Sequence, residues 1–101
     1  NAELRAAKME AHYWFDQIAR TEEGVINDVW PIFIPKTSNR AKAYLWLSKH
    51  LGISNEDCHI GMFDVEMCKR VCEISKVALD NHKYGLPTRP PEPNNFEFFK
   101  D

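Results

Sequence analysis

Apolar residues recur at helical spacing at the start of the chain. They are separated by steps of seven, four and three, at Leu4, Ala11, Phe15 and Ile18. Steps of this kind place side chains on one face of a helix. Asn1 stands where a capping residue is expected. The stretch therefore predicts an amphipathic helix from Asn1 to about Arg20 that turns its apolar face to the core.

A second helix is predicted after Thr37 and Ser38, either of which can serve as its cap. Its broad apolar face is formed by Ala41, Tyr44, Leu45, Leu47 and Leu51. Gly52 follows and favours a left-handed turn that ends the helix. The opposite side is expected to carry Lys42, Trp46, Lys49 and His50.

A third helix is predicted to begin after Asp64, which stands at an N-cap position. Apolar and small residues then repeat at helical spacing to about His82, at Val65, Cys68, Val71, Cys72, Ser75, Ala78 and Leu79. Ser54 and Asp57 are three residues apart, and this spacing predicts one short helical turn near residues 54–58.

Together these patterns predict an all-α fold, a small bundle of three main helices plus a short helical turn. Pro31 and Pro35 interrupt an apolar segment, so an irregular apolar loop is expected between the first two helices. We expect residues 1–84 to form the domain and residues 85–101 to form an extended, Pro-rich and aromatic tail. The predicted core contains Leu4, Phe15, Ile18, Tyr44, Leu45, Leu51, Val65, Val71, Cys72 and Leu79.

The composition is that of one globular domain, with 101 residues of which 44% are hydrophobic. No apolar run approaches the roughly 18 residues needed to span a bilayer, and the first residues show no signal-peptide core. We therefore expect a cytoplasmic protein without membrane contact. The formal net charge of -2 gives no general attraction to nucleic acid, so such binding would require a local basic surface.

Four residues are of types that bind zinc: Cys58, His59, Cys68 and Cys72. The sequence lacks the CxxC pairs of structural zinc sites, and two of the thiols fall on the apolar stripe of the third helix. We expect the thiols to be core residues, with no metal and no cofactor. Phosphate-binding glycine loops and the common catalytic motifs are also missing, which predicts a protein that is not an enzyme. A cysteine- or metal-dependent enzyme is the less favoured alternative.

The segment CHIGMFD, residues 58–64, predicts a corner between two helices. We expect Gly61 to adopt a backbone conformation closed to other residues, and Ile60 with Met62 or Phe63 to fill the core. The histidine is expected to form a hydrogen bond with nearby backbone, and the aspartate to cap the next helix. The structural corner thus consists of His59, Gly61, Phe63 and Asp64.

A basic and aromatic surface is predicted on the second helix, because no acidic residue occurs between Lys36 and His50. The candidate nucleic-acid-binding residues are Lys36, Arg40, Lys42, Trp46 and Lys49. Cations of this kind pair with phosphates, and an exposed indole stacks on a base. The alternative is an ordinary solvated helix face that carries one exposed aromatic side chain.

Two apolar segments outside the predicted helices indicate a second possible function, in protein interaction or homo-oligomerisation. The candidate residues of the 29–35 loop and the 96–99 tail are Trp30, Phe33, Phe96, Phe98 and Phe99. Aromatic residues at the end of an extended tail are expected to fold back on the domain or to dock on another molecule.

Three segments carry a family resemblance: NAELRAAKMEAH, AYLWLSKHLGI and CHIGMFDVEMCKRVCEI, in this order. Most of residues 1–80 resembles the C-terminal helical part of an uncharacterised family of small bacterial and phage proteins described as zinc-finger-containing. Fuller members carry a cysteine-rich zinc ribbon before this part, which we expect to be absent here, so none of its ligands is carried over. The resemblance implies a small helical domain and favours a non-enzymatic binding module that contacts nucleic acid.

Overall fold

The computed structural model describes residues 1–20, 39–86 and 88. Within these residues the secondary structure is entirely helical, which confirms the predicted all-α class with its three main helices. The elements are α1 (Ala2–Arg20), α3 (Asn39–Leu51), the short 3-10 helix η1 (Ile60–Met62) and α4 (Val65–Lys83). The predicted apolar loop between the first two helices lies outside the described residues.

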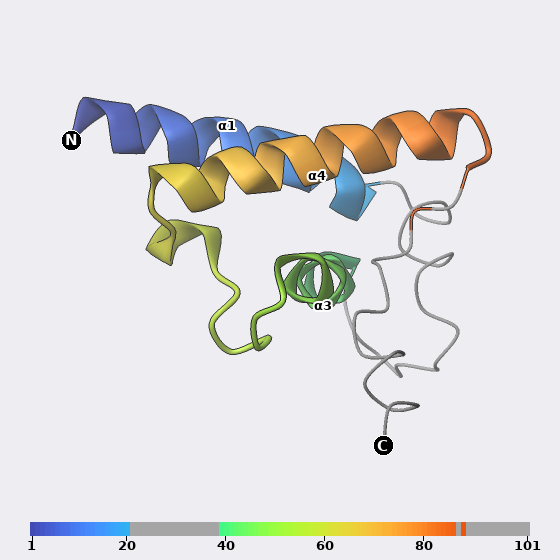
Figure 1. Ribbon diagram of the computed structural model, residues 1–101, viewed down its shortest axis with the longest axis horizontal. Coiled ribbons are helices and arrows are strands. Elements are labelled where there is room, and N and C mark those ends of the chain that lie inside the picture. Colours follow the sequence, from blue (N-terminus) through green and yellow to red (C-terminus); the bar gives the residue numbers. More distant parts are fainter. Residues whose placement is uncertain (21–38, 87, 89–101) are drawn as a thin grey trace, which may run out of the picture.

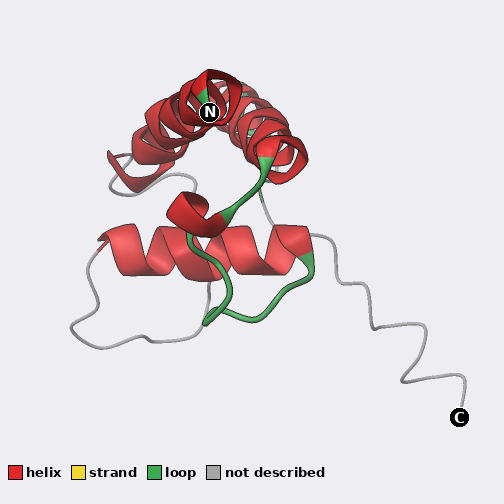
Figure 2. Ribbon diagram, turned by 90° about the vertical axis from the view of Figure 1, so that its left-hand side faces the viewer, coloured by secondary structure: helices red, strands yellow, loops and turns green. Residues whose placement is uncertain are grey.

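Helices α1 and α4 run side by side in the same direction and form one layer of the fold (Figure 1). Two contacts at successive positions along the helices show the parallel arrangement. Lys8 Nζ donates to the Gly61 carbonyl, just before α4, over 2.6 Å, and Lys76 Nζ lies 3.7 Å from Glu10 Oε1 further along. Helix α3 crosses beneath this layer, and Figure 2 shows it from the side. The core therefore lies between the α1–α4 pair and α3.

The helix ends follow the predicted capping residues. Leu4 N–H donates to Asn1 Oδ1 over 2.7 Å, and Met67 N–H donates to Asp64 Oδ1 over 2.8 Å. Each of these side chains satisfies a backbone donor that the helix itself leaves unpaired. After α3 the chain turns at Gly52, which has a φ of 71°. These three predicted helix-end residues are confirmed, whereas Thr37 and Ser38, the expected caps of the second helix, lie outside the described residues.

The buried core includes half of the predicted set. Phe15, Ile18, Leu51, Val71 and Cys72 are buried, whereas Leu4, Tyr44, Leu45, Val65 and Leu79 are partly exposed. The core also contains side chains that were not in that set: Ala11, Ala43, Trp46, Leu47, Cys58, Ile60, Phe63, Cys68 and Ala78. Small residues of α1 and α4 belong to it because the two helices pack closely along their length.

The short helical turn is present but lies later in the chain than predicted. It forms at Ile60–Met62, whereas residues 54–58 form hydrogen-bonded turns in which Asp57 N–H donates to Ser54 Oγ over 3.2 Å. The intervening His59 has extended backbone angles, φ −135° and ψ 115°. An extended residue interrupts the helical hydrogen-bond series, and this explains why the two turns remain separate.

The chain turns back toward α3 after α4. Gly85 has a φ of 72°, and Leu86 N–H donates to the Asn81 carbonyl over 2.7 Å. Thr88 then lies buried, with 5% of its surface exposed. The predicted division between a domain and a tail at residue 84 stays a prediction, but Thr88 from the tail side packs with the domain. None of the described helices combines the length and apolar character that a membrane crossing requires.

Candidate nucleic-acid interface

Helix α3 faces the core with a side that only partly matches the predicted one, in which Leu47 and Leu51 are buried as expected. Trp46 is 1% exposed and Leu47 is fully buried, whereas Leu45 is partly exposed and Ala41 is exposed. The prediction that Trp46 is exposed is therefore wrong. Adjacent residues are about 100° apart around a helix, so the core-facing side of α3 is rotated toward Trp46 and away from Leu45 relative to the prediction.

Burial of the Trp46 indole is made possible by a partner for its polar atom. Trp46 Nε1–H donates to the Thr88 carbonyl over 3.0 Å, and the His50 ring packs edge-on against the indole with centroids 4.6 Å apart. An indole N–H that lost its bonds to water without gaining a partner would oppose burial. Trp46 thus joins the segment after α4 to α3, and it is not available to stack on a base in this structure.

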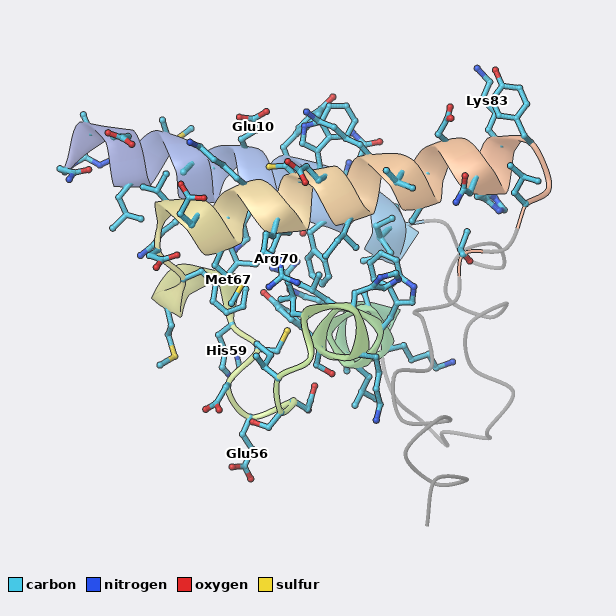
Figure 3. All side chains as sticks on the ribbon, in the orientation of Figure 1. Glu10, Glu56, His59, Met67, Arg70 and Lys83 are labelled. Atoms are coloured by element: carbon cyan, nitrogen blue, oxygen red, sulfur yellow. The ribbon has the colours of Figure 1, made fainter. Side chains whose placement is uncertain are left out.

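The remaining exposed side of α3 carries two lysines. We call this surface the outer face of α3 and define it as Ala41, Lys42, Leu45 and Lys49. Lys42 and Lys49 are seven residues apart, which is about two helical turns. No acidic residue occurs within Asn39–Leu51. The nearest acidic segment in sequence is the loop after α3, where Glu56 projects from the edge of the molecule (Figure 3). The outer face is therefore locally positive.

Arg40 is held by an ion pair at the start of α3. Its Nη1 lies 2.9 Å from Asp16 Oδ1 of α1, and the two side chains are 53% and 33% exposed. The guanidinium also lies over the Tyr44 ring, 5.9 Å from its centroid. Exposed ion pairs contribute little net stability, so Arg40 can exchange this carboxylate for a phosphate at small cost. Lys36 lies outside the described residues.

The predicted corner is confirmed in two of its four residues. Asp64 caps α4, and Phe63 is buried at 7% exposure together with fully buried Ile60, whereas Met62 is 76% exposed. The exposed His59 packs its ring against Tyr44, with centroids 6.0 Å apart. Within the described residues its imidazole forms no hydrogen bond, so the expected bond to nearby backbone is not found.

Gly61 does not have the conformation that the sequence suggested. The positive φ angles at described glycines belong to Gly52 and Gly85, and a Cβ added at Gly61 would meet no atom within 4 Å. The corner is formed by the extended residues on both sides of η1, so it does not require a glycine.

This difference gives a direct test with a matched control. Gly61→Ala is expected to change the free energy of unfolding by less than about 0.5 kcal/mol, the usual range for surface substitutions. Gly52→Ala is expected to cost about 1 kcal/mol, because alanine is strained at positive φ. Urea denaturation of both variants would measure the difference. Equal losses would contradict the assigned roles.

The three thiols are buried and do not fit a zinc site. Cys58 and Cys68 are fully buried and Cys72 is 8% exposed. Burial raises the pKa of Cys58 to about 11, and it also raises the pKa of Cys68 and Cys72. A zinc ligand must be a thiolate, which these sites disfavour. Among the described residues, no three His, Cys, Asp or Glu side chains are grouped so as to hold an ion.

The protein-interaction residues proposed from the sequence cannot be placed. Trp30, Phe33, Phe96, Phe98 and Phe99 all lie outside the described residues. The structure instead exposes two other large apolar residues one turn apart on α1, Met9 at 68% and Tyr13 at 59%.

Sequence reasoning also missed a cavity of about 270 Å³ between α3, α4 and Thr88. The lining residues come from three separate parts of the chain, so their spacing in the sequence gave no signal. Only His50 and Ala78 among them had been noted, as members of the basic side of the second helix and of the apolar stripe of the third.

Comparisons with known proteins gave one family match. A family model described as a zinc-finger-containing domain matches residues 1–78. The match covers α1, α3, the corner and most of α4, and it ends before Thr88. A search of curated proteins found no match, and a search of solved structures found none either.

Proposed function

Since the chain belongs to the family of zinc-finger-containing domains, we propose that it is a small, non-enzymatic binding module that contacts nucleic acid through the outer face of α3. The observation that carries this proposal is the positive character of that face, with two lysines about two turns apart on a helix without an acidic residue. The phosphates of a single-stranded or duplex nucleic acid are attracted to such a surface even when the whole protein is slightly acidic.

The geometry favours recognition of the phosphate backbone by charge. Trp46 is buried, so this face has lost the aromatic platform on which a base was expected to stack. Lys42 and Lys49 supply the positive charge for phosphates on this face, and Arg40 joins them when it leaves Asp16. Contacts to phosphates position a nucleic acid but do not read its sequence. Binding through this face is therefore expected to be strongly salt-dependent and weakly selective.

The chemistry of the described residues supports a non-enzymatic role within the same proposal. The thiols are protonated at neutral pH because burial raises their pKa values, and a thiol is a far weaker nucleophile than a thiolate. The correspondence of residues 1–78 to the C-terminal helical part of bacterial and phage family members stays a prediction, as does a cytoplasmic location.

The double substitution Lys42→Glu, Lys49→Glu is expected to abolish retention of a labelled oligonucleotide. Both lysines lie on the outer face of α3, and their reversal puts two negative charges opposite the phosphates. The measurement is fluorescence anisotropy over a salt series, with circular dichroism to confirm the fold. In the unsubstituted protein, log K should fall linearly with log salt concentration, by about 0.7 per single-strand phosphate contact.

A matched control has the same change in charge on another surface. In Lys69→Glu, Lys83→Glu both substituted lysines are exposed residues of α4, and Figure 3 shows Lys83 directed away from α3. This variant should keep most of the binding. Equal loss in both double variants would mean that net charge governs binding, and unchanged binding in the α3 variant would exclude the outer face.

Protein interaction is the second candidate function, and the exposed Met9 and Tyr13 on α1 favour it. Two large apolar side chains one turn apart form a small anchor for an apolar partner surface. Apolar docking is not weakened by rising salt. A partner that remains bound at high salt, and is unaffected by the α3 double variant, would favour this candidate.

A further inference from the structure

Helix α1 carries a second apolar stripe on the side that faces away from the core. Its members are separated by four, three and four residues and are exposed. They are Ala2, Ala6, Met9 and Tyr13, and we call them the outer stripe of α1. At about 100° per residue, they lie opposite the buried residues Ala11, Phe15 and Ile18. The buried residues face α3 and α4, so α1 has two apolar sides and the described fold covers only one of them.

The large side chains of the outer stripe are partly held in place. The Tyr13 ring packs edge-on against the Trp14 ring, with centroids 5.1 Å apart and planes 85° apart. On the side of α4, Lys76 Nζ lies 5.0 Å from the centroid of Trp14. These contacts restrict the tyrosine, so less conformational entropy is lost when a partner covers it. Neighbouring exposed apolar residues, unlike single ones, mark interaction sites.

Two charged residues lie on one flank of the outer stripe. Arg5 and Asp16 are eleven residues apart, which places them within about 20° of each other around the helix. Arg5 is exposed, and the Asp16 side chain is 33% exposed. Asp16 contacts Arg40 through Oδ1, and a carboxylate has a second oxygen that can accept. This flank therefore carries a positive group near its start and a negative group near its end.

An antiparallel pair of α1 helices brings the charged and apolar groups together. In a two-fold symmetric pair, each flank of one helix meets the same flank of the other, which runs in the opposite direction. Met9 and Tyr13 lie two residues on either side of residue 11. A two-fold axis at that height places Met9 of each copy against Tyr13 of the other. The same axis brings Arg5 of each copy within about one residue's rise, 1.5 Å, of Asp16 of the other.

One pair of like charges near this axis is neutralised within each copy. Glu10 lies on the opposite flank, one residue from the height of the axis, so the two copies of Glu10 approach each other. Figure 3 shows Glu10 on the side of the α1–α4 layer that faces away from α3. Lys76 Nζ lies 3.7 Å from Glu10 Oε1 of the same copy. The two carboxylates therefore do not meet as uncompensated charges, which would oppose association.

We propose that the outer stripe of α1 binds a second copy of this chain, forming a two-fold symmetric homodimer with the two α1 helices antiparallel. The inference rests on protein interaction, the second candidate function, and names its partner. Self-association is favoured over a different partner because the apolar contacts and the ion pairs both complement themselves about one axis. A single pair of helices buries less than the roughly 1,200–2,000 Å² of a standard interface, so the dimer is weak and depends on concentration.

The first experiment measures mass against concentration by sedimentation equilibrium of the full chain. Between about 10 μM and 1 mM, the mass should rise from that of one chain toward that of two, as expected for weak affinity. Tyr13→Glu should raise the dissociation constant of the dimer at least tenfold, because it puts a carboxylate into the apolar contact. Val77→Glu is the matched control, since Val77 is 58% exposed on α4. A constant monomer mass, or equal weakening by both substitutions, would overturn the proposal.

The second experiment exchanges the charges on the flank. Arg5→Asp should raise the dissociation constant about fivefold, because two exposed ion pairs are lost. Adding Asp16→Lys to this variant should restore the dimer, since the pairs then form with reversed sign. The contact of Asp16 with Arg40 is exposed and contributes little to the fold, which circular dichroism would check. Failure of the exchange to restore association would contradict the paired flanks.

The third experiment determines the orientation of the two helices. A nitroxide spin label on Ala2→Cys reacts selectively with the added cysteine, because the native thiols are buried. This protein is mixed with ¹⁵N-labelled unsubstituted protein, so that only contacts between copies broaden the NMR signals. The antiparallel dimer should show broadening at amides 17–20. Broadening centred on residues 2–6, or none at concentrations where the dimer forms, would overturn the antiparallel arrangement.

The dimer and the nucleic-acid interface fail in different ways, because they use different helices. Lys42→Glu, Lys49→Glu should leave the dissociation constant of the dimer unchanged. A chain that retains oligonucleotides but stays monomeric at 1 mM would contradict the dimer alone. A chain that dimerises through Tyr13 but does not retain oligonucleotides would support the dimer and contradict the interface on α3.

Discussion

Trp46→Ala is expected to lower the free energy of unfolding by about 3–5 kcal/mol, as truncation of a large buried aromatic residue usually does. Trp46 is 1% exposed and is the largest fully buried side chain of the described core. A domain of this size has only a few kcal/mol to spare, so a large share of the variant should be unfolded at 37 °C. Thermal and urea denaturation followed by circular dichroism would measure the effect.

The neighbouring leucine is the control for this prediction. Leu45 is only partly buried. Leu45→Ala is therefore expected to cost less than about 1.5 kcal/mol, well below the 2–5 kcal/mol of a fully buried leucine. The orientation of α3 predicts this order of effects, whereas the sequence pattern predicted the reverse. A larger loss for Leu45→Ala than for Trp46→Ala would show that α3 is rotated differently.

Removal of the chain after Tyr84 is expected to destabilise the domain by about 1–3 kcal/mol, the cost of leaving a buried donor unpaired. The deletion removes Thr88, whose carbonyl accepts from Trp46 Nε1–H over 3.0 Å. Urea denaturation of the shortened chain would measure the loss.

A second deletion separates this contact from the rest of the tail. A chain that ends after Pro90 keeps Thr88 and its carbonyl as an ordinary peptide group, and it should retain most of the stability. If both deletions were equally stable, the bond between Trp46 and Thr88 would contribute nothing measurable. Light scattering of the same two proteins would also show whether the residues after Pro90 change the oligomeric state.

The sequence predicted α1 and α4 well because each has one clear apolar stripe. Phe15 and Ile18 on α1, and Val71 and Cys72 on α4, are separated from the charged residues by the helical period, and all four are buried. Capping residues at Asn1 and Asp64 confirmed where these helices begin. Local physical chemistry was therefore sufficient for two of the three helices.

The predicted core-facing side of α3 was only partly right, with Leu47 and Leu51 buried as expected but Trp46 buried as well, because the apolar residues of this helix are consecutive. Residues 43–47, AYLWL, place an apolar side chain on every face of the helix, so periodicity alone cannot choose the buried one. The choice depends on tertiary contacts, above all the Thr88 carbonyl that pairs the indole. That group is 42 residues away in sequence, and no local rule brings it to Trp46.

The cavity was missed for the same reason, since its lining comes from α3, α4 and the segment after α4. The role of Gly61 was misjudged differently: glycine permits a positive φ but does not require one. The candidate phosphate-binding lysines were predicted from charge alone, and the structure places Lys42 and Lys49 on the outer face of α3.

The parallel pairing of α1 and α4 has a consequence during synthesis of the protein. Two neighbouring antiparallel helices can close as a hairpin as soon as both have been made, but α1 finds its main partner only when residues 65–83 have left the ribosome. Until then α1 lacks its α4 partner, although the Phe15 ring can already pack against Tyr44 of α3. Contacts between such distant segments slow folding, and they make this chain a candidate for chaperone binding and for proteolysis before α4 emerges.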